Sequence, residues 1–215
     1  DAQLSRGLGD VYKRQLDAKE LTMSSLGQLY SPSLALLTDL YQLTMSYGYW
    51  KAGMGNHESV FHLFYRKNPF KGGYGIAAGL EHAIDLVTNA HFQNDDLEYL
   101  ATLVGNDGNP LFEDEFLHYL QSTPLSIDMD AVPEGTVVFP HEPIIRVRGN
   151  IIPCQLFETP LLTLINFQTL IATKASRVCA AAKEDTVLEF GLRRAQGFDG
   201  GLSASRAAYI GGCHA

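Results

Sequence analysis

The spacing of hydrophobic residues in the first half of the chain predicts one helix, two strands and three further helices. Over residues 33–52, apolar side chains recur every three or four positions, and Ser33 is a candidate N-cap. Strands are expected over 58–67 and 73–78, joined as a hairpin because Asn-Pro-Phe-Lys-Gly-Gly lies between them. The helices are expected over 79–90, 94–104 and 110–121.

The second half of the chain passes from β-rich runs to a long helical pattern. Short runs of valine and isoleucine, interrupted by prolines, predict a compact β layer over 125–153. A mostly buried helix is expected over 155–182, followed by a short strand that carries Arg193 and Arg194 and by a helix over 202–210. This alternation indicates an α/β fold, with an α+β N-terminal domain over 29–153 and the first part of an incomplete β/α barrel over 154–215.

Residues 1–28 show no usable periodicity and scatter glycines and charges. We expect them to be an unstructured leader. Residues 5–15 resemble the translated adapter-like text found at the ends of assembled environmental sequences, so the leader is a candidate non-native segment.

Composition and charge exclude several classes of partner. The 215 residues include 16 basic and 24 acidic side chains, a formal net charge of -8, which argues against sequence-independent nucleic-acid binding and against membrane surfaces. No apolar run approaches the roughly 20 residues that span a bilayer, and no secretory signal is evident, so a cytoplasmic location is expected. The three cysteines form no CxxC pair and are expected to be free thiols, with Cys213 as a candidate pocket residue or an inert buried thiol.

The segment over 188–201, Leu-Glu-Phe-Gly-Leu-Arg-Arg-Ala-Gln-Gly-Phe-Asp-Gly-Gly, has the composition of an anion site. Arg193 and Arg194 carry planar guanidinium groups that match a carboxylate or phosphate with two parallel hydrogen bonds. Neighbouring glycines allow the backbone to approach a ligand closely. The alternative is a solvated strand edge or a structural ion pair.

Four segments in order resemble the nicotinate phosphoribosyltransferases, over about residues 36–212. They are Leu-Leu-Thr-Asp-Leu-Tyr-Gln at 36–42, Phe-Tyr-Arg-Lys-Asn-Pro-Phe at 64–70, Phe-Glu-Thr-Pro-Leu-Leu at 157–162 and Gly-Leu-Arg-Arg-Ala-Gln-Gly at 191–197. The resemblance implies coupling of nicotinate to 5-phosphoribosyl 1-diphosphate, which yields nicotinate mononucleotide and diphosphate. It also implies ATP hydrolysis through a phosphorylated histidine, magnesium, and a homodimer with shared active sites.

The same resemblance implies roles for particular residues. Phe190 would stack on the pyridine ring, while Arg193, supported by Arg194, would reach the nicotinate carboxylate or a neighbouring phosphate. Tyr41 would cover the other ring face from the partner subunit. Arg66 and Lys67 would bind phosphate in that same partner site. The structural alternatives are core packing for Phe190 and Tyr41 and a solubilising strand end for Arg66 and Lys67.

The chain also departs from the family pattern. The family's phosphorylated histidine and main diphosphate-binding segments lie beyond Ala215, so no catalytic residue and no metal ligand is assigned within the chain. An aspartate follows the position of Cys213 in the family, where this sequence has His214. We expect a truncated chain that is poorly stable and inactive alone. Two alternatives to a nicotinate phosphoribosyltransferase remain. One is a related enzyme that uses nicotinamide or quinolinate, and the other is a non-catalytic module that binds a ligand or a partner.

Overall fold

A computed structural model describes residues 34–214 of the chain, so the predicted leader over 1–28 and the candidate cap Ser33 lie outside the described residues. The first described helix, α3 (Leu40–Lys51), begins later than predicted. Asp39 precedes it with an extended backbone, and its N–H donates to Oε1 of Gln42 at 3.0 Å. This capping box starts the helix at Leu40 because it satisfies a backbone donor that the helix itself leaves free.

A three-stranded antiparallel sheet has the order β1-β5-β3, where β1 is Glu58–Leu63, β5 is Ile145–Asn150 and β3 is Ile127–Ala131. Ile145 and Val147 of the central strand point inward and are almost fully buried. A separate pair joins β2 (Gly75–Ile76) to β4 (Val137–Val138). The predicted hairpin between the first two strands is therefore wrong.

The chain leaves β1 through a short 3₁₀ turn, η1 (Pro69–Lys71). Phe70 and Lys71 both have left-handed backbones there, with φ values of 56° and 55°. That geometry directs the chain away from β1, and β1 instead pairs along its whole length with β5. A strand's partner is set by such long-range packing as well as by the nearest turn.

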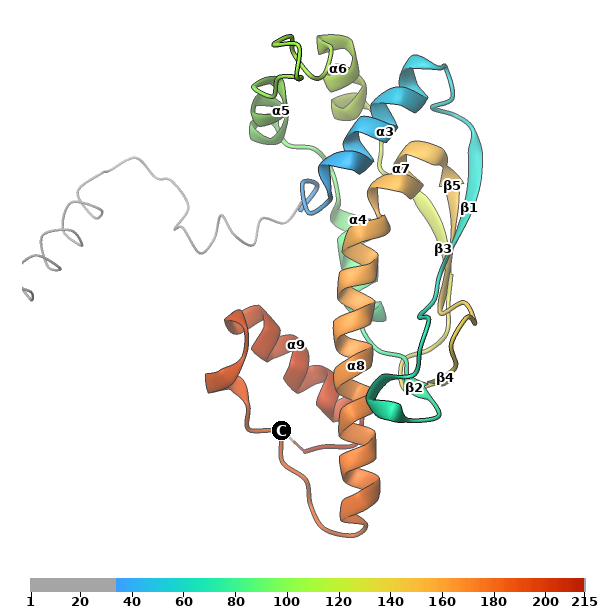
Figure 1. Cartoon of the computed structure of the whole chain (residues 1–215), viewed down its shortest axis with the longest axis vertical. Coiled ribbons are helices and arrows are strands. Elements are labelled where there is room, and N and C mark those ends of the chain that lie inside the picture. The colour runs from blue at the N-terminus through green and yellow to red at the C-terminus, as the bar shows by residue number, and fades with distance from the viewer. Residues whose placement is uncertain (1–33, 215) are drawn as a thin grey trace, which may run out of the picture. The chain divides into compact units, whose positions relative to one another are not determined.

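The three predicted helices of the first half are confirmed as α4 (Leu80–Asn89), α5 (Asn94–Ala101) and α6 (Asp114–Ser122). The β layer of the second half is confirmed too, but Ile151 and Ile152 open a helix, α7 (Ile151–Leu156), instead of ending a strand. The long helix α8 (Glu158–Ala182) follows directly. Figure 1 shows α8 running between the β layer and the last helix.

The last part of the described chain consists of the 3₁₀ turn η2 (Leu192–Arg194) and α9 (Gly197–Ile210). The prediction that Arg193 and Arg194 lie on a strand is wrong, because both belong to η2. Leu188 forms a single parallel bridge with His214, in which the His214 N–H donates to Val187 O at 2.8 Å. The α9 helix starts five residues earlier than predicted and connects the two sides of this parallel bridge.

The described residues combine helices with two small sheets, which confirms the α/β class. Within residues 34–214, no helix combines the length and the apolar character needed to cross a bilayer.

Candidate functional site

A pocket of about 540 Å³ lies between α8 and the segment that runs from η2 into α9. Thr163, Phe167 and Gln168 of α8 line one side, and Leu192, Arg194 and Asp199 belong to the other. Both walls come from elements close in sequence, so the fold of the 188–210 segment decides the shape of the pocket.

Two glycines allow η2 to fold back against α9. Gly197 has φ of +80°, a left-handed backbone that glycine adopts without a Cβ clash, and α9 begins there. Gly201 lies against Leu192, where an added Cβ would come within 2.3 Å of Leu192 Cδ1. A side chain at position 201 would therefore require the Leu192 side chain to move.

Phe190 and Arg193 lie together beside this pocket. The guanidinium carbon of Arg193 is 5.3 Å from the centre of the Phe190 ring, within the range of a cation–π contact. Phe190 is 81% exposed, so it packs in no core that the described residues form. Arg193 makes no ion pair with any carboxylate in the part of the chain that the structure describes.

Arg66 and Lys67 line a second pocket, of about 460 Å³, between the end of β1 and α8. Its other walls are mostly apolar, with Asn166 and Thr169 of α8 among the polar exceptions. The two pockets adjoin at Thr163, but their other α8 residues alternate along the helix, so they lie on adjacent faces of it. One chain therefore does not bring Arg66 and Lys67 into the pocket of Arg194.

Tyr41 lines neither pocket. It is 47% exposed, which contradicts core packing, and it lies near the start of α8, where partial burial and then the Glu158 carboxylate raise its pKa. The nearby Thr159 hydroxyl donates to Asp39 Oδ2 at 2.7 Å. Along α8, Thr159 precedes the pocket residue Thr163 by four positions, about 6 Å at a rise of about 1.5 Å per residue.

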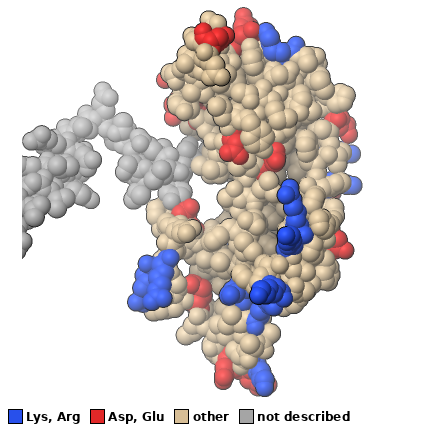
Figure 2. Space-filling model, in the orientation of Figure 1, with Lys and Arg blue, Asp and Glu red and all other residues tan. Residues whose placement is uncertain are grey.

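Cations without a carboxylate partner gather beside these two pockets. Among residues 34–214, the cations that form ion pairs are Lys51, Arg146, Arg148 and Arg206. Those without one include Arg66, Lys67, Lys71, Lys174, Arg177, Arg193 and Arg194. Figure 2 shows Lys and Arg side chains gathered over η1 and α8 and again at η2. In a chain with net charge -8, unpaired cations at two pockets favour an anionic ligand.

The sequence profile of the nicotinate phosphoribosyltransferase (NAPRTase) N-terminal domain matches residues 36–166. This chain belongs to the nicotinate phosphoribosyltransferase family. A nicotinate phosphoribosyltransferase of Caenorhabditis elegans is 45% identical over 193 residues, which are 89% of this chain and 33% of the relative. One from Bacillus subtilis is 42% identical over 180 residues, 84% of this chain and 36% of the relative. The chain spans about one third of the length of the curated relatives it matches.

Solved structures agree with the family. The crystal structure of human nicotinic acid phosphoribosyltransferase matches with a TM-score of 0.74 and 40% identity, over 82% of this chain and 35% of the human one. A nicotinate-nucleotide pyrophosphorylase from Pyrococcus furiosus matches with a TM-score of 0.61 over 91% of this chain and 40% of its own. At 21% identity, the second match shows a shared fold only.

In this member of the nicotinate phosphoribosyltransferase family, sequence reasoning missed two cations on α8. Nη1 of Arg177 donates to Phe70 O at 3.0 Å, and Nζ of Lys174 lies 4.5 Å from the centre of the Phe70 ring. Together they hold the left-handed η1 turn that follows Arg66 and Lys67. A signal was available in the sequence, because Lys174 and Arg177 are the only charged residues from 159 to 182 and lie three positions apart, on one helix face.

The cysteines of the described chain are free, as expected. Sγ of Cys179 lies 3.6 Å from Sγ of Cys213, and burial first and then this neighbour raise the pKa of Cys213 to about 11. A thiol with so high a pKa is a poor nucleophile at neutral pH. Cys213 also does not line the α8–α9 pocket, which favours the inert interpretation.

Proposed function

We propose that these residues form part of an enzyme that joins nicotinate to 5-phosphoribosyl 1-diphosphate, with release of diphosphate and with ATP hydrolysis as the driving reaction. Membership of the family and relatives named nicotinate phosphoribosyltransferase at 42–48% identity support the proposal. The observation that carries it is the pair of Phe190 and Arg193, which offers a flat apolar face and a guanidinium side by side. Nicotinate presents the complementary pair, an aromatic ring and a carboxylate.

In the proposed reaction, the ring nitrogen of nicotinate forms a bond to ribose C1 while the bond from C1 to the diphosphate oxygen breaks, and its electron pair leaves with diphosphate. The transition state has positive charge on the ribose, so the rate depends on holding the ring nitrogen in line with C1. Phe190 would fix the ring plane, and Arg193 would fix its rotation through the carboxylate. Arg194, which lines the pocket, would support the same anion or a neighbouring phosphate.

The proposal includes a homodimer with shared sites. Tyr41 lines neither pocket, and Arg66 and Lys67 line a pocket other than that of Arg194, so the described chain does not place these groups around one ligand. All three residues are exposed. A partner subunit that placed Tyr41, Arg66 and Lys67 against the Phe190 site would complete it. Dimer formation therefore belongs to the proposal and not to the observed fold.

ATP and magnesium enter only as expectations for the whole enzyme. No three His, Cys, Asp or Glu side chains gather into a possible metal site among residues 34–214, so the described residues do not fit a protein-held magnesium ion. The phosphorylated histidine is expected beyond Ala215.

The parallel bridge between Leu188 and His214, connected through α9, supports the proposal that residues 154–215 begin a β/α barrel. Large apolar side chains remain exposed in the same segment, namely Leu188, Leu192, Leu202 and Tyr209. Further barrel elements would bury such surface. We accordingly assign the activity to the whole protein, in the cytoplasm, and expect the 215 residues alone to be inactive.

Product formation by the complete gene product tests the proposal. Nicotinate, nicotinamide and quinolinate are each supplied with 5-phosphoribosyl 1-diphosphate, ATP and magnesium. The nucleotide product is separated by chromatography and identified by its mass in a mass spectrometer. The proposal expects nicotinate mononucleotide from nicotinate. Product from nicotinamide instead, or from quinolinate with release of carbon dioxide, would move the enzyme to a related activity. Binding of nicotinate without any product would indicate a non-catalytic relative.

A further inference from the structure

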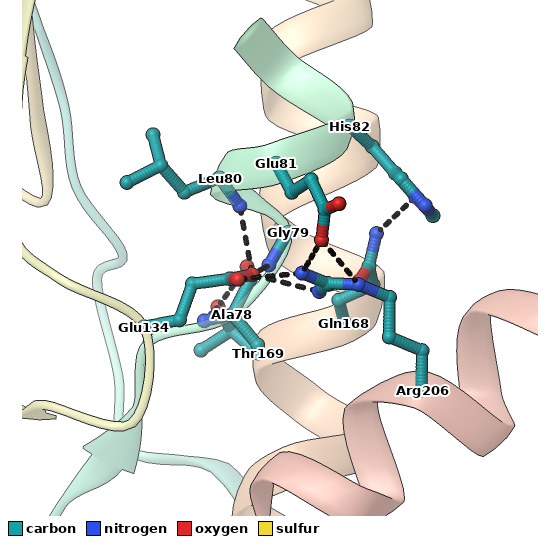
Figure 3. Close-up of polar contacts among 9 residues, drawn as sticks. All are labelled: Ala78, Gly79, Leu80, Glu81, His82, Glu134, Gln168, Thr169 and Arg206. Carbon is teal, nitrogen blue, oxygen red and sulfur yellow. Dashed lines mark hydrogen bonds and ion pairs between the residues drawn. The ribbon is translucent and has the colours of Figure 1, made fainter. Parts of the chain in front are cut away.

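A cluster of polar side chains joins α9 to α8 and α4 behind the α8–α9 pocket (Figure 3). Its members, called here the Arg206 cluster, are Glu81, Glu134, Gln168 and Arg206. Nη2 of Arg206 donates to Glu134 Oε2 at 2.6 Å, and Nη1 donates to Glu134 Oε1 at 2.9 Å. Nε donates to Glu81 Oε2 at 3.1 Å. One guanidinium thus bridges two carboxylates, with the bidentate geometry that only arginine provides.

Glu134 connects this arginine to the start of α4. Its Oε1 accepts the backbone N–H groups of Gly79 at 2.6 Å and Leu80 at 3.0 Å. The side chain is only 21% exposed, and hydrogen bonds from Arg206 first, then from these N–H groups, hold its pKa below the ordinary value. Four hydrogen-bond donors hold the partly buried Glu134 carboxylate in one orientation. The carboxylate in turn fixes Arg206 against α4.

Gln168 carries the connection into the pocket wall. Its Oε1 accepts from Arg206 Nη1 at 3.2 Å, which turns its amide nitrogen toward Nδ1 of His82 at 2.9 Å. Because that nitrogen donates, Nδ1 of His82 must accept, so all hydrogen bonds of the group are mutually consistent. Gln168 is 1% exposed and lines the pocket opposite Arg194.

Much of the remaining contact between α8 and α9 is made by small residues, with Ile171 of α8 and Ile210 of α9 packed beside them. Ala172 and Ala175 of α8 face Ala207, Ala208 and Gly211, and an added Cβ at Gly211 would lie 2.5 Å from Ala172 O. The small residues bring the two helices close, and the isoleucines add apolar contact beside them. The hydrogen bonds of Arg206 add a directional contact that favours one register of α9 against α8.

We propose that Arg206 is a positioning residue for the nicotinate site. By fixing α9 against Glu134, Glu81 and Gln168, it sets where η2 presents Arg193 and Arg194 along α8. This inference rests on the proposed function for its ligand, whereas the positioning of η2 and α9 stands on the contacts alone. Arg206 does not line the pocket, so it acts through α9 and not by touching substrate.

The first arm of the test uses the complete gene product and needs no activity. Hydrogen exchange is measured by mass spectrometry on the wild type, Arg206→Met and Arg146→Met. Arg146 is the matched control because it also donates two hydrogen bonds to one carboxylate, that of Asp130, on the exposed face of the sheet. We expect amides of residues 191–204 to exchange on the order of 10-fold faster in Arg206→Met only. Unchanged exchange there, or an equal rise throughout the chain, overturns the proposal.

The second arm uses the complete gene product and separates the two KM values. Arg206→Met is expected to raise KM for nicotinate on the order of 10- to 100-fold while KM for 5-phosphoribosyl 1-diphosphate changes little. Arg206→Lys should recover part of the loss. A merely structural role would lower kcat through loss of folded enzyme and leave both KM values unchanged, and that result counts against the proposal.

A milder variant covers the case in which Arg206→Met does not fold. Glu81→Gln removes one partner whose side chain is 69% exposed, so the fold should tolerate it, and the nicotinate KM should rise in the same direction by a smaller factor. An unchanged KM in folded Glu81→Gln enzyme, together with unchanged exchange over 191–204, contradicts the inference. If the wild-type gene product makes no nicotinate mononucleotide, the proposed function fails, and the exchange arm still decides the positioning role.

Discussion

Arg193 lies over the exposed ring of Phe190, with its guanidinium carbon 5.3 Å from the ring centre. Neither side chain contributes to the hydrophobic core, and Arg193 pairs with no carboxylate among the described residues. The ring face and the guanidinium are therefore both accessible on the surface of the described residues. Binding an aromatic acid gives both groups a partner, and the following predictions follow from the fold that holds them.

Phe190→Ala should separate stability from function. Because the ring is 81% exposed, the free energy of unfolding of the complete gene product should change by less than about 0.5 kcal/mol in urea denaturation. The complete gene product with the same change should need on the order of 10-fold more nicotinate for half-maximal rate, because a stacking face is lost. A large loss of stability with an unchanged KM would instead make Phe190 a packing residue.

Arg193→Lys should weaken the preference for an acid over its amide. Lysine keeps the charge but cannot make two parallel hydrogen bonds to a carboxylate or stack as a plane on Phe190. We expect kcat/KM for nicotinate to fall about 10- to 100-fold, with little change for nicotinamide, in competition assays with both substrates. The matched change Arg194→Lys should have the smaller effect. Equal losses for both substrates would show that Arg193 does not recognise the carboxylate.

Gly79→Ala should destabilise the chain by at least about 2 kcal/mol. Gly79 has φ of +102°, and an added Cβ would lie 2.6 Å from the Leu164 carbonyl oxygen of α8. Gly48→Ala is the control, because that position lies within α3 with nothing within 4 Å of an added Cβ, and alanine should stabilise the helix by about 0.5–1 kcal/mol. Urea denaturation of both variants measures the difference. Similar effects at the two positions would contradict the close contact of Gly79 with α8.

Acid should weaken the chain through Glu134. Its pKa in the folded chain lies below the ordinary value of 4.5, so its stabilising contribution is present above about pH 4.5 and is lost as the pH falls through the lower, folded value. In Glu134→Gln that contribution is gone, so unfolding free energies measured from pH 6 down to pH 3 should fall less steeply than in the wild type. Parallel curves for the two proteins would show that Glu134 is not a stabilising carboxylate.

Helices whose own residues carry the pattern of a helix could be predicted from the sequence. Strand pairings and helix boundaries that depend on contacts with distant residues could not. The helices α4, α5 and α6 have apolar spacing and acidic first turns of their own. The pairing of β1 with β5 depends on residues about 90 positions away, and no local pattern contains that information. At Ile151, apolar residues that favour a strand begin α7 instead, because β5 ends at Asn150 and the chain must turn toward α8.

The candidate site shows the same division. Phe190, Arg193, Arg194, Arg66 and Lys67 were all identified from sequence motifs, and the structure places them beside or within two pockets. Their expected strand geometry was wrong for the arginine pair, because glycines at 197 and 201 allow a tight turn whose conformation depends on contact with α9. The Arg206 cluster could not be predicted, since its charged members come from three separate segments.

The most direct measurement of the central claim is the rate of nucleotide formation from labelled nicotinate by the complete gene product, in the wild type and in Phe190→Ala, over a range of nicotinate concentrations. The account predicts nicotinate mononucleotide that requires 5-phosphoribosyl 1-diphosphate, with a higher KM for nicotinate in the variant. Absence of that product in the wild type, or identical nicotinate dependence in both proteins, would contradict it.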